Sequence, residues 1–122
     1  MATIKSFTDL YQSKKLAEIL SNESADQTWE RIAIAGANLN VPEEMQYRHN
    51  GDMPFQIYSS IGIPCWSLAS LLSVLPNYQL QTQDDGIGIL CSCNEKFNIV
   101  TANNPVDACY EMIIKLNELN LL

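Results

Sequence analysis

Apolar residues recur at helical spacing in three stretches of the chain. The first, residues 6–20, begins at Ser6 as a capping residue and carries Asp9 in its first turn. The second, residues 65–76, sets a stripe of leucines against serines and stops at Pro76. The third, residues 105–119, follows Asn104, an N-cap residue, with a proline at its first helical position. We therefore expect three helices.

Between these stretches the pattern changes to β-type runs. Five segments read as strands, namely residues 29–36, 55–58, 78–82, 87–93 and 97–102. The last three alternate with short turns and predict a meander, in which a three-residue turn at 94–96 places Cys93 opposite Phe97. Residues 37–53 show no sustained period and contain proline and glycine, which predicts a long loop.

Together these elements predict one α+β domain over residues 1–122. About three helices pack on one face of a mostly antiparallel sheet, with a C-terminal β-meander followed by a long C-terminal helix. A chain of 122 residues is long enough to bury one core. No repeat, low-complexity stretch or linker divides it.

Composition narrows the classes of partner. Hydrophobic residues make up 47% of the chain and charged residues 17%, which is ordinary for a globular protein. Seven basic against 14 acidic residues give a net charge of −7, so nonspecific attraction to nucleic acid or to an anionic membrane is disfavoured and a basic protein partner is favoured. The N-terminal residues turn polar too early for a signal peptide, and no apolar run is long enough to span a membrane. We expect a cytoplasmic protein, in which cysteines stay reduced.

Two of the four cysteines lie two apart. Side chains at that spacing on a strand share one face, so Cys91 and Cys93 are in phase with Ile87 and Ile89 and are expected in the core. Cys109, on the apolar stripe of the last helix, could join them as a metal ligand. One C-x-C pair with isolated cysteines matches zinc-site spacings poorly, so we expect no metal and no other cofactor.

Cys65 suggests a different chemistry. It falls at the predicted start of the second helix, where the positive helix end lowers the pKa of a thiol. A nucleophilic cysteine also needs a base, and the sole histidine, His49, lies in the predicted loop. No cysteine-enzyme signature surrounds Cys65, and a structural thiol is the competing interpretation. No catalytic residue is assigned.

The predicted loop carries residue types common at binding hot spots. We take Tyr47, Arg48 and His49, with Trp66, as candidate partner-binding residues. The competing interpretation is that Trp66 closes the core and the loop is solvated. The adjacent acids Glu43–Glu44 and Asp84–Asp85 read as turn residues rather than catalytic pairs, and no nucleotide-binding motif is present.

Three stretches carry a resemblance: SKKLAEILSNESADQTW (13–29), IPCWSLASLLSVLP (63–76) and NPVDACYEMIIKLNELNLL (104–122). They look like segments of small uncharacterised proteins of gut Bacteroidetes, often encoded on phages or other mobile elements. The last stretch is the most specific, and the three cover under half of the chain. The resemblance implies a bacterial cytosolic setting and a mobile-element gene neighbourhood, and it implies no activity, ligand or catalytic residue.

Two functions of different classes remain open. The first is a non-enzymatic, acidic protein-binding accessory domain of a bacterial mobile element or phage. It is favoured by acidity, small size and the lack of a catalytic set. The alternative is a small-molecule-binding protein or a thiol-dependent enzyme that uses Cys65 with His49.

Overall fold

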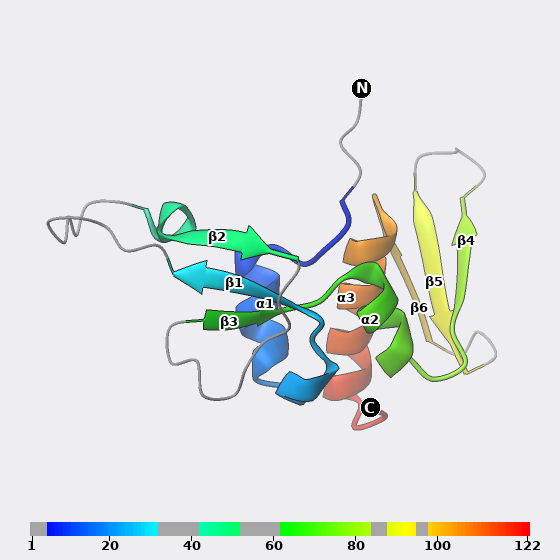
Figure 1. The fold of residues 1–122 in the computed structure, drawn as a ribbon. Coiled ribbons are helices and arrows are strands. Elements are labelled where there is room, and N and C mark those ends of the chain that lie inside the picture. The colour runs from blue at the N-terminus through cyan, green and yellow to red at the C-terminus, as the bar shows by residue number, and fades with distance from the viewer. Residues whose placement is uncertain (1–4, 32–41, 52–61, 84–87, 95–97) are drawn as a thin grey trace, which may run out of the picture. The chain divides into compact units, whose positions relative to one another are not determined.

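The computed structural model describes residues 5–31, 42–51, 62–83, 88–94 and 98–122 (Figure 1). Over these residues the fold is α+β, as predicted, and its strands are antiparallel. The chain divides into two compact units. Unit 1 comprises Met1–Thr8 with Ser67–Leu122, and unit 2 comprises Asp9–Trp66.

Unit 2 begins with helix α1 (Leu10–Ala17). Its N-cap is Asp9 rather than the predicted Ser6. The Asp9 carboxylate accepts from the backbone N–H of Gln12 at 2.8 Å, and the Gln12 side chain accepts from the Asp9 N–H at 3.1 Å. This reciprocal capping box satisfies two N–H groups at once, which a serine further upstream cannot do for this turn.

The sheet of unit 2 has the strand order β2-β1-β3, with both neighbours antiparallel to β1. Its strands are β1 (Gln27–Arg31), β2 (Tyr47–Asn50) and β3 (Gly62–Cys65). Two 3₁₀-helices, η1 (Asn22–Ser24) and η2 (Glu43–Gln46), precede β1 and β2. Helix α1 packs against β3 (Figure 1).

The prediction of a loop over residues 37–53 is wrong for its described part, which contains η2 and β2. Strand β2 is short and polar, so it has no recognisable pattern of its own. It forms because each of its residues pairs with β1, for example Asn50 with Thr28. The predicted strand at 55–58 and the end of the one at 29–36 lie outside the described residues.

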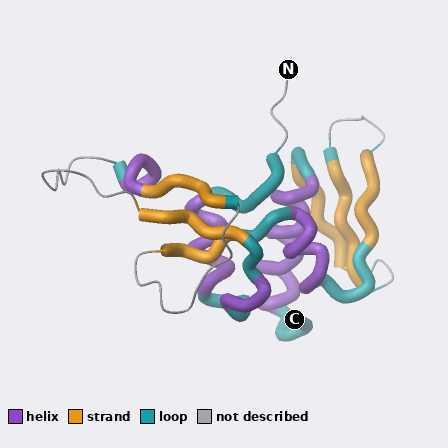
Figure 2. The backbone as a smooth tube through the Cα atoms, viewed as in Figure 1, coloured by secondary structure: helices purple, strands orange, loops and turns teal. Residues whose placement is uncertain are grey.

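Unit 1 contains the β4-β5-β6 meander and two helices (Figure 2). The strands are β4 (Gln79–Thr82), β5 (Ile89–Cys93) and β6 (Asn98–Ala102), and the helices are α2 (Leu68–Val74) and α3 (Pro105–Glu118). The meander and the long C-terminal helix are confirmed. As predicted, Asn104 caps α3, its side chain accepting from the Asp107 N–H at 2.9 Å.

The strands make two sheets where the sequence predicted one. The hairpin register also differs, because Cys93 pairs with Asn98 and Cys91 with Val100. The connection is therefore one residue longer than predicted, and Asn94 enters it with a positive φ of 55°. A one-residue slip exchanges the faces of a strand. It turns Val100 toward the cysteine face and Ile99 away from it, and Ile99 is accordingly 44% exposed.

The core of unit 1 lies where α3 packs on β5 and β6. Fully buried side chains of α3 are Val106, Ala108, Cys109, Met112, Ile113 and Leu116. Cys91 and Cys93 are fully buried on β5. The prediction that Cys91, Cys93 and Cys109 are core residues is confirmed.

Candidate functional site

Three polar side chains of unit 2 meet on one face of its sheet. Gln27 pairs with Cys65 of β3, and His49 of β2 pairs with Trp29, two residues further along β1. The Gln27 amide oxygen accepts a hydrogen bond from His49 Nε2 at 2.6 Å, and the Cys65 thiol points at the same oxygen from 3.9 Å. The two residues of the proposed thiol chemistry therefore converge on one amide.

The surroundings of His49 favour the neutral imidazole. Partial burial lowers the pKa of His49 from its ordinary 6.5, and the Asp26 carboxylate opposes this shift. The Trp29 ring lies edge-on to the imidazole with 5.7 Å between ring centroids. Gly51 leaves room for the ring, since a Cβ at this position would lie 3.2 Å from His49 Cε1. The ring is thus held by close packing as well as by its hydrogen bond.

This arrangement does not make a thiolate–imidazole pair. When Nε2 donates its proton to Gln27, it is not free to accept one from Cys65. Cys65 is also 0% exposed. It is the last residue of β3 and not the start of a helix, so the expected lowering of its pKa by a helix end has no structural basis.

The four predicted partner-binding residues do not share one surface. Tyr47 and His49 point to one face of β2 and Arg48 to the other, because side chains alternate along a strand. Arg48 Nε lies 3.3 Å from a carboxylate oxygen of Glu30. Trp66 is 0% exposed, and its indole N–H donates to Ser24 Oγ at 2.9 Å. Burial of Trp66 therefore matches the interpretation in which it closes the core.

A different surface of unit 2 presents large apolar side chains. Lys14 of α1 forms an ion pair with Glu43 of η2, and its ammonium lies 6.0 Å from the centre of the Tyr47 ring. Tyr11, one helical turn before Lys14, is 75% exposed, and Met45, two residues after Glu43, is 67% exposed. We call Tyr11, Lys14, Glu43, Glu44 and Met45 the α1–η2 surface.

Sequence reasoning missed Tyr11, Met45 and Gln27. For the first two a signal was available, since Tyr11 lies off the apolar stripe of its helix and Met45 stands alone between polar residues. An apolar residue outside a core pattern is a candidate for contact with another molecule. Gln27 carried no such signal, because its role depends on pairing between strands distant in sequence.

The cysteine cluster of unit 1 has its own electrostatics. The Cys109 thiol donates to the Cys91 sulfur, which lowers the pKa of Cys91 and raises that of Cys109. Burial raises the pKa of Cys93 to about 11. Over the described part of the chain, no group of three or more His, Cys, Asp or Glu side chains is placed to bind a metal ion. All three thiols are fully buried in the core of unit 1.

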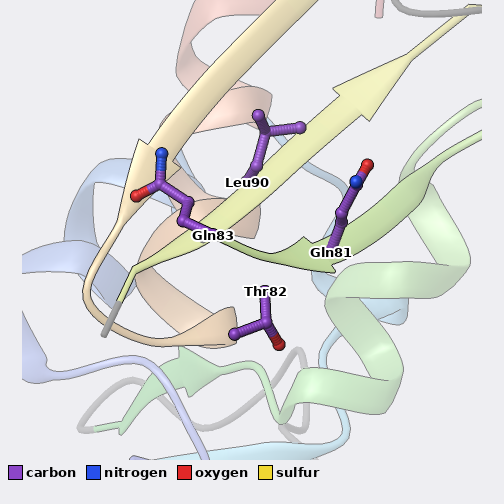
Figure 3. A pocket seen from close by; sticks show the side chains of 4 residues that line it. All are labelled: Gln81, Thr82, Gln83 and Leu90. Carbon is purple, nitrogen blue, oxygen red and sulfur yellow. The ribbon is translucent and has the colours of Figure 1, made fainter. Parts of the chain in front are cut away.

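A shallow hollow of about 190 Å³ lies on the β4–β5 hairpin and is lined by Gln81, Thr82, Gln83 and Leu90 (Figure 3). Gln81, Gln83 and Leu90 lie on one side of the strands and Thr82 on the other (Figure 3). Among the described residues, the lining consists of two glutamine amides, a threonine hydroxyl and a leucine side chain. The amides and the hydroxyl can donate and accept hydrogen bonds.

Of the acidic pairs, Glu43–Glu44 lies in η2, while Asp84–Asp85 falls outside the described residues. Comparison with known proteins adds no assignment, since no protein-family model, no curated protein and no solved structure matches this chain. Among the helices that the structure describes, none has the length and apolar character needed to cross a bilayer.

Proposed function

We propose that this protein is a non-enzymatic, acidic protein-binding module that serves as an accessory factor of a bacterial mobile element or phage. The observation that carries the proposal is the exposure of Tyr11 (75%) on α1 and of Met45 (67%) on η2, the two elements that the Lys14–Glu43 ion pair joins. Tyrosine and methionine are both enriched in protein interfaces. The ion pair links α1 to η2, which carry the two side chains.

The charge of the molecule supports a basic partner. The chain carries a net charge of −7, and Glu44 of η2 is exposed. A net negative charge speeds encounter with a positively charged protein and disfavours encounter with other acidic proteins. In this arrangement Tyr11 and Met45 supply most of the affinity, and Glu44 contributes to selectivity.

Site-specific photo-crosslinking tests this proposal. A benzophenone amino acid replaces Tyr11 or, in a second variant, Met45, and each variant is irradiated in an extract of a gut Bacteroidetes bacterium. Ser73 of α2, an exposed residue of unit 1, takes the same substitution as the matched control. We expect one protein to be captured from positions 11 and 45 and not from position 73, and Glu44→Lys to weaken that capture while the cooperative melt is kept. If positions 11 and 45 capture only what position 73 captures, the proposal is wrong.

A thiol-dependent enzyme remains the alternative, and one observation favours it: Cys65 and His49 meet at the Gln27 amide. Complete burial of Cys65 and the shared acceptor oppose it. Alkylation with iodoacetamide at neutral pH separates the two functions. Rapid labelling of Cys65 alone, lost in His49→Gln, would favour the enzyme, whereas slow labelling of every cysteine favours the binding module.

A further inference from the structure

Strand β4 of unit 1 ends its sheet. Among the described residues it pairs with β5 and with no other strand. The N–H of Gln83 donates to the carbonyl of Gly88 at 2.9 Å, which fixes the direction of the backbone groups along this hairpin. Because that direction alternates in an antiparallel pair, Leu80 and Thr82 turn their N–H and C=O groups away from β5. Within the part of the chain that the structure describes, no strand pairs with these groups, and they form an open hydrogen-bonding edge, the free edge of β4.

The opposite edge of the same sheet, strand β6, is contacted by a lysine side chain. Lys115 of α3 donates from Nζ to the carbonyl oxygen of Ile99 on β6 at 3.1 Å. A lysine at an edge discourages another strand from pairing there. Strand β4, with the sequence QLQT, has no charged residue, no proline and no bulge in its pairing with β5. The two edges are therefore not equivalent.

The distribution of charge bears on whether a second copy of the chain can pair with the free edge of β4. Two copies of a chain with a net charge of −7 repel each other. Gln81 of β4 and its neighbour Leu90 of β5, which share the outer face beside this edge, are both uncharged. This neutral strip is where a second copy can approach without placing like charges opposite each other.

We propose that β4 is a self-association edge, at which β4 of a second copy of this chain pairs antiparallel with the first. In the register that places Gln81 on the twofold axis, Leu80 of each copy lies opposite Thr82 of the other. Their outward N–H and C=O groups then bond reciprocally, and the two Gln81 amides face each other on the outer side. The contact is self-complementary, as a twofold interface requires. It concerns unit 1 and does not rest on the proposed function.

The predicted affinity is modest. A strand of four residues buries little area, well below the roughly 1,200 Å² at which stable interfaces begin. We therefore expect a dissociation constant of about 10–100 µM. The dimer would be populated where the protein is concentrated and would dissociate on dilution.

Sedimentation equilibrium over about 5–500 µM protein tests the proposal. We expect the average mass to rise from the 13.7 kDa of one chain toward twice that value. Gln81→Glu and Gln81→Lys each place two like charges on the axis and should weaken association by about tenfold or more. An equimolar mixture of the two variants should associate again, because the charges are then opposite. A merely destabilising substitution would not be rescued in this way.

Thr101→Glu is the matched control, since it adds the same charge as Gln81→Glu on the outer face of β6 and should leave association unchanged. Thr82→Pro is a second probe. It removes an outward N–H while the β4–β5 bonds of Gln81 and Gln83 remain. A wild-type protein that stays monomeric throughout, Gln81 variants that associate like wild type, or a mixture that fails to recover would each overturn the proposal.

Discussion

Protonation of the His49 imidazole is less favourable in the folded protein than in the unfolded chain. Its pKa is lowered by burial, which is only partly offset by the Asp26 carboxylate. The unfolded chain, in which a histidine has its ordinary pKa of about 6.5, therefore takes up a proton at a higher pH than the folded protein does. A group of this kind stabilises the fold above its unfolded pKa and loses that contribution as the pH falls.

We predict that the free energy of unfolding decreases as the pH is lowered from about 6.5 toward the depressed pKa of His49. Urea denaturation monitored by the fluorescence of Trp29 and Trp66 would measure it. His49→Gln keeps a donor for Gln27 without a titrating group, and it should flatten the pH dependence in this window. An unchanged slope in the variant would assign the effect to other groups.

The same site marks a limit of sequence reasoning at the residue scale. Cys65 and His49 were suspected together, but their meeting point, Gln27, depends on the pairing of β1 with both β2 and β3. Trp66 is of a residue type that is common at binding hot spots, yet its indole N–H donates to Ser24 Oγ inside unit 2. Neither the contacts at Gln27 nor the hydrogen bond of Trp66 can be predicted from the residues that are adjacent to these side chains in sequence.

At the scale of elements, a helix or strand could be predicted from sequence where its own residues carry the signals that specify it. Helix α3 was predictable because Asn104, Pro105 and Asp107 specify its start within four residues. Strand β2 was not, because YRHN has no alternation and its stability comes from β1. The division of the strands into two sheets could not be predicted either, because it depends on which strands pair, and the pairing segments are distant in sequence.

The β5–β6 register gives a test at the same scale. Val100 pairs with Cys91 on the buried face, while Ile99 is 44% exposed. We predict that Val100→Asp destabilises the protein by about 3 kcal/mol, because it turns a carboxylate toward the core. Ile99→Asp should cost less than about 1 kcal/mol, the usual range for strand preference. Chemical denaturation of both variants would compare them, and the reverse order would restore the register predicted from sequence.

At the scale of the whole molecule, the four free thiols report on the two units separately. Cys91, Cys93 and Cys109 belong to one core in unit 1, and Cys65 belongs to unit 2. All four are fully buried, so alkylation requires the protein to open.

We predict that the three thiols of unit 1 become reactive together, over the same range of urea, because opening that core exposes all of them. Cys65 is expected to follow its own range. Pulse alkylation at increasing urea, read residue by residue by mass spectrometry, measures both. Labelling of Cys91 while Cys109 stays protected would show that the core opens in parts and would contradict the prediction.

The path of the chain through the two units has a genetic consequence. Unit 2 is one continuous segment, whereas unit 1 is assembled from both sides of it. The two flanks are joined inside unit 1, where Phe7 bridges to Ser67 and the Leu68 N–H donates to the Ser6 carbonyl at 3.1 Å. The chain thus leaves unit 1 after Thr8 and returns to it at Ser67, at two neighbouring points that we call the seam. A recombination event with breakpoints at this seam could exchange residues 9–66 for another sequence in one step, so the surface of one unit can diversify while the core of the other is inherited intact.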